Sequence, residues 1–407
     1  MKKNILLICF GFFVAIGVAQ DFNKMSPLRK IEFSGNYSLN STVLNYNFLN
    51  GIYTGQFIDS DLKNSVQNKL GAYNLMGAEI NASALYFHSI APRTSFFAGV
   101  GYDIDLGIQF TDDLFNIIFY GNKEYAGKTA DLQGTQVKFM QSQSLQFGFT
   151  KDWTDTLLLS HRMQLGLSLI KGENLYDITV NSGNIFTQQT GEYIDITMKG
   201  DMYQSDTNNT GFDAFNGLGA GLNLKYEVKK DSSYRILFEA RNLGFMRWNN
   251  NTIHNSMDTT IRFEGIVIDN IFAIQDSTFN NINAQSIAGD GLKARKESHW
   301  MLLPITLHAN YRQYLGAKNY LEGDITYKNW GTYIPKLMVA YGRKFNKCLS
   351  ADINAGYGGY GTYHLGLNFN ADCKYFQLRA GASDLLGFIA PKEFSNQGVY
   401  LMAAYLF

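Results

Sequence analysis

Residues 218–228 read LGAGLNLKYEV, with an apolar side chain at every even position and a glycine or a polar residue at every odd one. Successive side chains of a β-strand point to opposite faces of a sheet, so this segment presents one apolar face and one wet face. The period of two therefore predicts an amphipathic strand.

The same alternation recurs along the chain, for example over residues 163–169, 349–357 and 362–369. At about 10 to 15 residues, the predicted strands are longer than the average of about 5 or 6 in globular proteins. They suit a tilted strand, which crosses a membrane with roughly 9 to 11 residues. The alternation predicts strands over residues 30–40, 75–88, 94–108, 140–151, 159–171, 215–229, 233–247, 299–312, 318–330, 334–346, 348–357, 360–371, 373–384 and 397–407.

The connections between these strands are alternately long and short over most of the chain. The long ones span residues 41–74, 109–139, 172–214 and 248–298, and the short ones span 89–93, 152–158, 230–232 and 313–317. This parity places the four long loops at one end of a barrel and both termini at the other. Outer-membrane barrels have this asymmetry, with short periplasmic turns and longer external loops. The predicted fold is all-β, a transmembrane antiparallel β-barrel of about 14 strands with short helices in its long extracellular loops.

The first residues have the pattern of an export signal. Lys2 and Lys3 precede an uncharged apolar stretch over residues 5–18, and Gly17-Val18-Ala19 supplies the small residues that a signal peptidase reads. We expect a signal peptide over residues 1–19, and residues 20–407 as a single outer-membrane barrel domain. No later segment has about 18 uncharged apolar residues in a row, which excludes helical membrane spans.

The last residues form another amphipathic strand. Val399, Leu401, Ala403, Tyr405 and Phe407 alternate with the remaining positions up to a terminal aromatic. Such an ending is the form that outer-membrane assembly machinery reads, so Tyr405 and Phe407 are the predicted assembly signal. We expect an outer-membrane location, with membrane lipid and the assembly machinery as partners.

The composition agrees with a membrane barrel. Aromatic residues make up 14% of the chain, with 25 Tyr and 30 Phe, whereas there are only 5 Pro. Aromatic residues suit strands with interfacial girdles. The formal net charge is zero, which gives no reason to propose nucleic acid as a partner.

Two short amphipathic helices are predicted in the long loops. Residues 59–70 begin with Asp or Ser as a cap, and residues 112–119 precede Gly121, which suits a helix C-terminus. The same Asp59-Ser60-Asp61 run resembles the start of a calcium loop. It lacks the glycine at the sixth position and the closing glutamate, so helix capping is the expected role.

Two cysteines, Cys348 and Cys373, follow the predicted signal peptide. Both begin predicted strands, and these strands lie two apart in the barrel. Because neighbouring strands are about 4.8 Å apart, the two Cα atoms would be near 10 Å, which is too far for a relaxed disulfide. We expect free thiols.

Several short patterns resemble one protein family. They are residues 113–122 (DLFNIIFYGN), 242–248 (NLGFMRW) and 263–266 (FEGI), together with Leu303-Pro304 opening a strand that ends near Tyr311. They resemble an outer-membrane β-barrel family of uncharacterised function that is common in Bacteroidota. That family is distantly similar to long-chain fatty-acid transporter barrels and to barrel subunits of the type IX secretion system. The resemblance covers most of the mature chain and implies a fold and a location, but no catalytic residue. Where such families have an Asp before Leu-Gly-Phe, this chain has Asn242.

The sequence lacks the usual motifs of enzymes and metal sites. It has no phosphate-binding glycine loop with a lysine, no Gly-x-Ser-x-Gly elbow and no paired-cysteine motif. The six histidines are scattered, without the spacing of a metal site. We therefore expect no enzymatic activity, no cofactor and no bound metal.

The charged residues on the wet faces of the strands are the candidate site. Both signs are mixed, which leaves three interpretations open: mutual neutralisation inside a narrow barrel, a substrate path with polar selectivity, or a gate held by opposite charges. The predicted lumen residues are Asp103, Asp105, Lys225, Glu227, Glu239, Arg241, His308, Arg312, Glu322, Asp324, Lys328 and Arg379.

Two functions fit this barrel. In the first, it transports a hydrophobic or small solute across the outer membrane, because a barrel of about 14 strands has room for a lumen. In the second, it is a structural or secretion-associated barrel that anchors or docks partner proteins. The possible partners are accordingly a hydrophobic ligand or a secretion-system protein.

Overall fold

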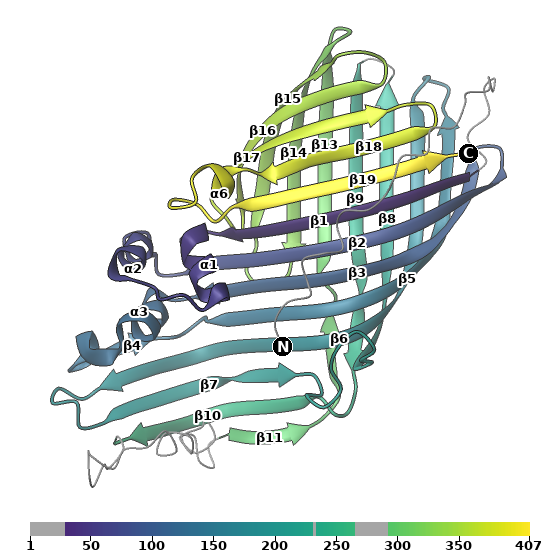
Figure 1. Cartoon of the computed structure of the whole chain (residues 1–407). Coiled ribbons are helices and arrows are strands. Elements are labelled where there is room, and N and C mark those ends of the chain that lie inside the picture. The colour runs from purple at the N-terminus through teal and green to yellow at the C-terminus, as the bar shows by residue number, and fades with distance from the viewer. Residues whose placement is uncertain (1–28, 231–232, 265–291) are drawn as a thin grey trace.

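The computed structural model describes residues 29–230, 233–264 and 292–407, so the predicted signal peptide lies outside the described residues. Fourteen strand positions form an antiparallel barrel, as predicted. The barrel is closed because β1 pairs with β19 from Lys30–Leu406 to Leu39–Gln397 (Figure 1). The strands at these positions are β1 (Arg29–Ser41), β2 (Asn74–Ala91), β3 (Thr94–Phe110), β5 (Gln136–Thr154), β6 (Ser160–Thr187), β8 (Gly217–Lys230), β9 (Tyr234–Trp248), β12 (His299–Leu302) continued by β13 (Ile305–Leu315), β14 (Asn319–Asn329), β15 (Ile334–Lys344), β16 (Leu349–Gly359), β17 (Tyr363–Asp372), β18 (Phe376–Asp384) and β19 (Gln397–Leu406).

β12 and β13 share one position in the barrel, where a single strand was predicted over residues 299–312. Both pair with β9, and Leu303 and Pro304 separate them. Proline has no N–H for the strand ladder, which explains the interruption. The Leu303 N–H still reaches the Gly244 carbonyl of β9 at 3.1 Å, so the wall stays closed.

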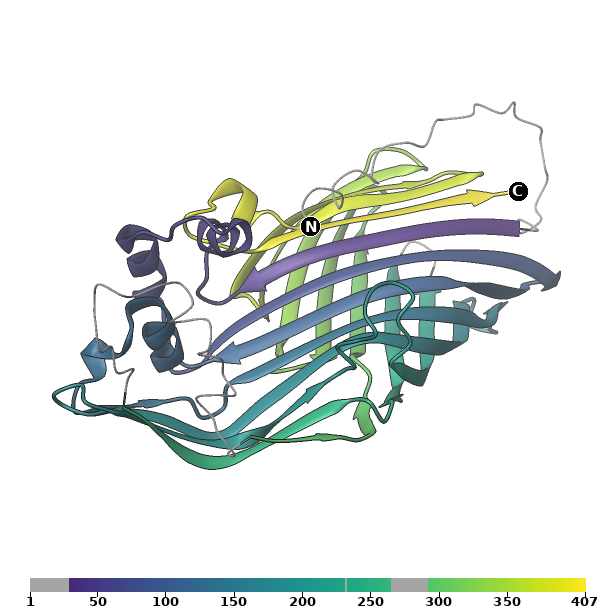
Figure 2. The same ribbon diagram turned by 60° about the horizontal axis from the view of Figure 1, so that its bottom comes forward.

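The barrel has two different ends. Both described termini and the short turns lie at one, called the turn end below, and the long connections lie at the other, the loop end (Figures 1 and 2). The alternation of long and short connections predicted this arrangement.

A side sheet extends from the wall at the loop end (Figure 1). β6 is 28 residues long, and its second half pairs with β7 (Ile194–Gln204), which pairs with β10 (Ile253–Phe263). β11 (Leu292–Lys296) extends this sheet from β10, and β4 (Lys128–Asp131) pairs with the end of β6. β4, β7, β10 and β11 lie in segments that were predicted as long loops, although the residues of β10 from Thr259 onward also alternate. A bulge at Glu173 allows β6 to belong to both sheets.

Helices cover the loop end of β1, β2 and β3 (Figure 2). α2 (Ser60–Gln67) begins at Asp59, whose carboxylate accepts the Leu62 N–H at 2.8 Å, and α3 (Asp112–Tyr120) ends at Gly121. Both helices were predicted, and Asp59 caps its helix as expected. α1 (Tyr46–Thr54), the short η1 (Asn122–Tyr125) and α6 (Leu386–Ile389) were not. α1, α2 and α3 lie on one apolar cluster, made of Val43, Leu44, Phe48, Leu49, Val66, Phe110 and Phe115.

The two faces of the wall differ as the alternation predicts. On β8, Leu222 and Leu224 are exposed on the outside, whereas their polar neighbours Asn223 and Lys225 face the lumen, where Asn223 donates to Ser168 and Lys225 pairs with Glu239. An apolar exterior around a polar interior is the arrangement of a transmembrane barrel. Among the described residues, no helix is long and apolar enough to cross a membrane.

The prediction of free thiols is wrong, because Cys348 and Cys373 form a disulfide with their Cα atoms 5.0 Å apart. Cys348 directly precedes β16, and Cys373 directly follows β17 rather than opening β18. β16 and β17 are neighbours, with Leu349 opposite Ala371. The two cysteines are therefore one strand apart at the turn end, where a disulfide can form.

Candidate functional site

The twelve predicted lumen residues all lie on the face of the wall opposite the exposed apolar side chains. On β14, for example, Leu321, Ile325 and Tyr327 are exposed outside, and the alternate positions Glu322, Asp324 and Lys328 face inward. Glu227 and Arg379 lie in two other parts of the wall, and Arg379 is 4.0 Å from Asp372. The remaining residues gather in the two groups described next and in one contact that crosses the lumen.

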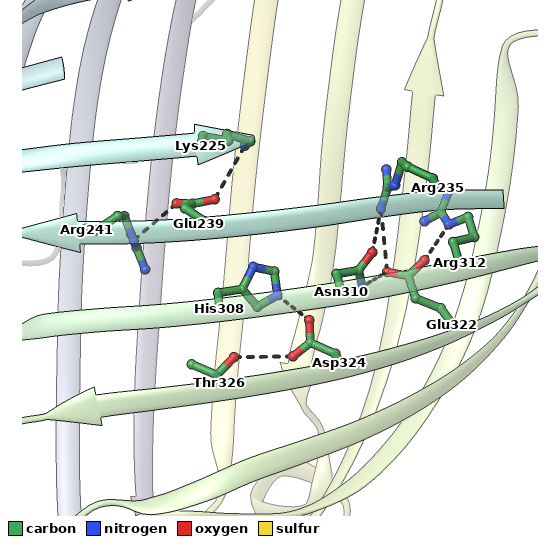
Figure 3. Close-up of polar contacts among 10 residues, drawn as sticks. All are labelled: Lys225, Arg235, Glu239, Arg241, His308, Asn310, Arg312, Glu322, Asp324 and Thr326. Carbon is green, nitrogen blue, oxygen red and sulfur yellow. Dashed lines mark hydrogen bonds and ion pairs between the residues drawn. The ribbon is translucent and has the colours of Figure 1, made fainter. Parts of the chain in front are cut away.

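The first group centres on Glu239 of β9 (Figure 3). Its carboxylate is 3.5 Å from the Lys225 ammonium of β8 and 3.3 Å from the Arg241 guanidinium two residues further along β9. Neighbouring positions on one face of a sheet bring such pairs together. Two cations share one carboxylate within one patch of wall, which leaves one positive charge there.

The second group lies on β9, β13 and β14 (Figure 3). Glu322 accepts hydrogen bonds from Arg312 and, at 2.6 Å, from the Asn310 side chain. Arg235 donates to the Asn310 side-chain oxygen at 2.9 Å and is 3.8 Å from Glu322.

Directly beside this group, Asp324 pairs with His308 and accepts the Thr326 hydroxyl at 3.2 Å (Figure 3). The strand register explains the contact between Arg312 and Glu322, because these two residues lie opposite each other on β13 and β14. In this group, acidic and basic side chains of nearby strands form ion pairs.

Lys328 of β14 behaves differently, because its partners lie across the barrel. Its ammonium is 2.6 Å from Glu79 of β2 and 2.6 Å from Asp105 of β3. In the ring, β5, β6, β8, β9 and β13 separate β3 from β14. Lys328 and Asp105 are only 5% and 4% exposed. This contact joins opposite walls, and Asp103 lies beside it, bound to Asn81 at 2.9 Å.

Two aromatic residues also link opposite walls beside Lys328. The Trp330 indole N–H donates to the Lys138 carbonyl of β5 at 3.2 Å, and the Tyr360 hydroxyl donates to the Trp330 carbonyl. The Tyr360 ring lies directly on Gly77 of β2, where an added Cβ would be 2.0 Å from it. Its hydroxyl lies over Gly107 of β3. Glycine permits this close approach because it has no side chain. We call Lys328, Trp330, Tyr360, Glu79 and Asp105 the crossing.

An apolar cluster adjoins the crossing. Trp330 belongs to it, and Trp248 and Leu303 within it are completely buried. Its members come from β5, β6 and β9, from the link between β12 and β13 and from the turn after β14, so it also joins opposite walls. The cluster consists of Met140, Ile170, Leu175, Met246, Trp248, Leu303 and Trp330.

Sequence reasoning placed Lys328 and Asp105 on the wet face but could not bring them together. Glu79 was missed, although it is a charge at a wet position of the predicted strand 75–88. Trp330 and Tyr360 are the end residues of the predicted strands 318–330 and 360–371 but lie in turns of the structure, so the alternation gives no direction for their side chains.

A second candidate site lies on the outer wall. It is an almost wholly apolar groove of about 1410 Å³ over β19, β1, β2, β3, β5, β6 and β8. Residues 205–216, between β7 and β8, form its roof through Phe212 and Phe215. No sequence pattern indicated this groove.

A family model described as a family of unknown function, DUF5723, matches residues 30–383. No curated protein matches the sequence. Three solved barrels are similar at low identity. A deltaS2S3 mutant of the monoaromatic hydrocarbon channel TodX is 10% identical, with a TM-score of 0.46, covering 94% of this chain and 90% of that one. A Pseudomonas aeruginosa FadL homologue is 10% identical, with a TM-score of 0.43 and coverages of 93% and 90%. The Ralstonia pickettii toluene transporter TbuX is 9% identical, with a TM-score of 0.42 and coverages of 94% and 89%.

Proposed function

The chain belongs to the family of unknown function DUF5723, and we propose that it is a gated outer-membrane barrel that transports a hydrophobic or small solute. The observation that carries the proposal is the crossing, in which Lys328 joins one wall to Glu79 and Asp105 on the other. Charged side chains line the lumen, and at one level a few of them connect its opposite walls. This arrangement suits a channel that opens when these contacts break.

The membrane location is supported by the closed sheet. A barrel satisfies every strand hydrogen bond within the wall, which is the condition for strands to cross lipid. Apolar side chains such as Leu222 and Ile353 are about half exposed on the outside, where lipid would cover them. By the usual asymmetry of such barrels, the loop end would face outward.

The chemistry of the crossing favours a gate over a permanent plug. Buried ion pairs contribute little net stability, since desolvation of the charges offsets their attraction. A fixed plug would be more stable if apolar residues replaced Lys328 and its two carboxylates. Breaking the contact exposes three charges to a polar lumen that can solvate them, so the open state is accessible.

Conductance in planar bilayers tests the gate. Lys328→Gln leaves Glu79 and Asp105 unpaired, and removal of one partner of a buried pair costs about 3–5 kcal/mol. That cost falls on the closed state, so the variant is expected to open far more often than the wild-type barrel. Lys225→Gln is the matched control, because Lys225 has its partner on the neighbouring strand. A folded Lys328→Gln barrel that stays as closed as the control would contradict the gate.

Solute uptake tests the transported class. Liposomes that contain the wild type, Lys328→Gln or no protein are compared for uptake of a hydrophobic aromatic solute and of a small sugar. The proposal expects uptake above the empty liposomes, increased by Lys328→Gln. If no solute enters through either barrel, transport is excluded.

The side sheet favours a second function, docking of a secretion-associated or other surface partner at the loop end. β6 continues well beyond the barrel to carry β7 and β10. Copurification of one defined partner with the wild type, lost when residues 176–204 are replaced by a short turn, would support docking. A barrel that transports and retains no partner would argue against it.

A further inference from the structure

The groove on the outer wall has a long apolar floor. Small residues such as Ala82 and Gly35 form its base, and Val100, Leu145 and Leu169 form part of its sides. It crosses seven adjacent strands, from β19 to β8. At a spacing of about 4.8 Å between neighbouring strands, the floor is roughly 29 Å across. Its volume of about 1410 Å³ exceeds the roughly 300–1,000 Å³ of ordinary small-ligand pockets.

The roof of the groove is held by side chains. The Phe212 carbonyl accepts from the Gln143 amide at 2.8 Å and from the Lys171 ammonium at 2.9 Å, and the Phe212 ring stacks on Tyr102. Phe212 and Phe215 are nonetheless 67% and 54% exposed. The roof is thus fixed to β5 and β6 through Phe212, and to β6 again through Asn216, while both aromatic rings stay largely exposed.

Polar groups gather at one end of this otherwise apolar site. Lys171 is 3.8 Å from Glu173, whose side chain is completely buried. Glu173 accepts from Gln143 and, at 2.5 Å, from Gln141. Gln143 donates both of its amide hydrogens, to Glu173 and to the Phe212 carbonyl, whereas the Lys171 ammonium keeps further N–H donors at the edge of the groove.

We propose that this groove binds a single-chain amphiphile, with its hydrocarbon chain along the floor and a hydrogen-bond-accepting head group beside Lys171. The long apolar floor fits the chain, and the Lys171 ammonium at one end fits the head group. The inference rests on the proposed function in one respect: the groove would be where the hydrophobic solute first binds. The binding itself does not depend on the gate.

Photolabelling of the purified full-length barrel in detergent tests the site. The probe is a long-chain alkyl carboxylic acid with a diazirine in its chain, and labelled residues are identified by mass spectrometry. Labels are expected on groove residues such as Leu145 and Leu169, and excess unlabelled acid is expected to remove them. Ala82→Phe, which fills the floor, is expected to lower this labelling about tenfold.

Ala355→Phe is the matched control, because Ala355 is an exposed outward residue of β16 outside the groove. Lys171→Met is expected to weaken labelling by the acid but not by an uncharged alkane probe of the same length. Equal labelling of every lipid-facing strand, or equal labelling in Ala82→Phe and Ala355→Phe, would overturn the site and indicate ordinary lipid contact. Because the Lys328→Gln conductance is measured separately, failure of the groove and failure of the gate are distinguishable.

Discussion

Gly77→Ala is predicted to strain the crossing. The new Cβ would lie 2.0, 2.3 and 2.4 Å from three atoms of the Tyr360 ring, distances that real Cβ contacts do not reach, so the ring must move. Overpacking of this kind costs about 1–3 kcal/mol. Loss of the Tyr360 hydrogen bond to the Trp330 carbonyl adds about 0.5–1.5 kcal/mol. The variant should therefore lose roughly 2–4 kcal/mol in free energy of unfolding.

Denaturant unfolding of the lipid-refolded barrel, followed by tryptophan fluorescence, measures this loss. Gly323→Ala is the control, because nothing lies within 4 Å of a Cβ added at Gly323. Removing the ring by Tyr360→Ala should abolish most of the effect of Gly77→Ala, which gives a coupling energy of about 1–3 kcal/mol between the two sites. Equal stability of Gly77→Ala and Gly323→Ala would refute the contact. A loss that persists in the Tyr360→Ala background would place the strain elsewhere in β2.

Three further predictions concern stability. Leu303→Ala empties a completely buried position of the apolar cluster and should cost about 2–5 kcal/mol of unfolding free energy, measured in the same denaturant titration. Cys348→Ser removes a disulfide that closes 25 residues, and loop entropy gives a loss of about 3.5 kcal/mol; reduction of the wild type should reproduce it, and an unchanged midpoint would count against it. Asp113 accepts at 2.6 Å from both the Tyr125 hydroxyl and the Asp131 N–H, and burial together with this carboxylate raises the pKa of Tyr125. Asp113→Ala should make residues 121–135 more sensitive to protease without changing the barrel transition, whereas unchanged cleavage would show that this contact does not hold the loop.

The strands of the barrel wall could be predicted because apolar side chains that face outward alternate with polar side chains that face the lumen. Residues 218–228 have lipid on one side and the lumen on the other, and both appear in the sequence. The helix that begins at Asp59 and the helix that ends at Gly121 could be predicted for a different reason, because helix caps depend on only a few neighbouring residues. The side sheet could not be predicted. β7 lies at the loop end, where its two faces do not have lipid on one side and the lumen on the other, so its residues need not alternate.

The disulfide shows a different kind of failure. Cys373 was assigned to the start of the next strand rather than to the end of β17. Moving this one boundary by three residues, from 373 to Phe376, changes the separation from the expected two strands to one. Whether two residues lie on neighbouring strands can therefore be inferred from sequence only where the ends of the turns are correctly predicted.

The charges of the lumen show what a strand pattern leaves undetermined. Lys225 and Lys328 have the same signature, a lysine at a wet position between apolar residues. Lys225 meets Glu239 on the adjoining strand, a contact that register alone explains. Lys328 meets Glu79 and Asp105 from the far wall, which requires the barrel to narrow until opposite strands touch. Alternation specifies the direction of a side chain but not the width of the lumen. Lys225→Gln and Lys328→Gln are therefore compared in one conductance experiment, because the partner of Lys225 lies beside it, whereas Lys328 is buried and its two partners lie across the barrel.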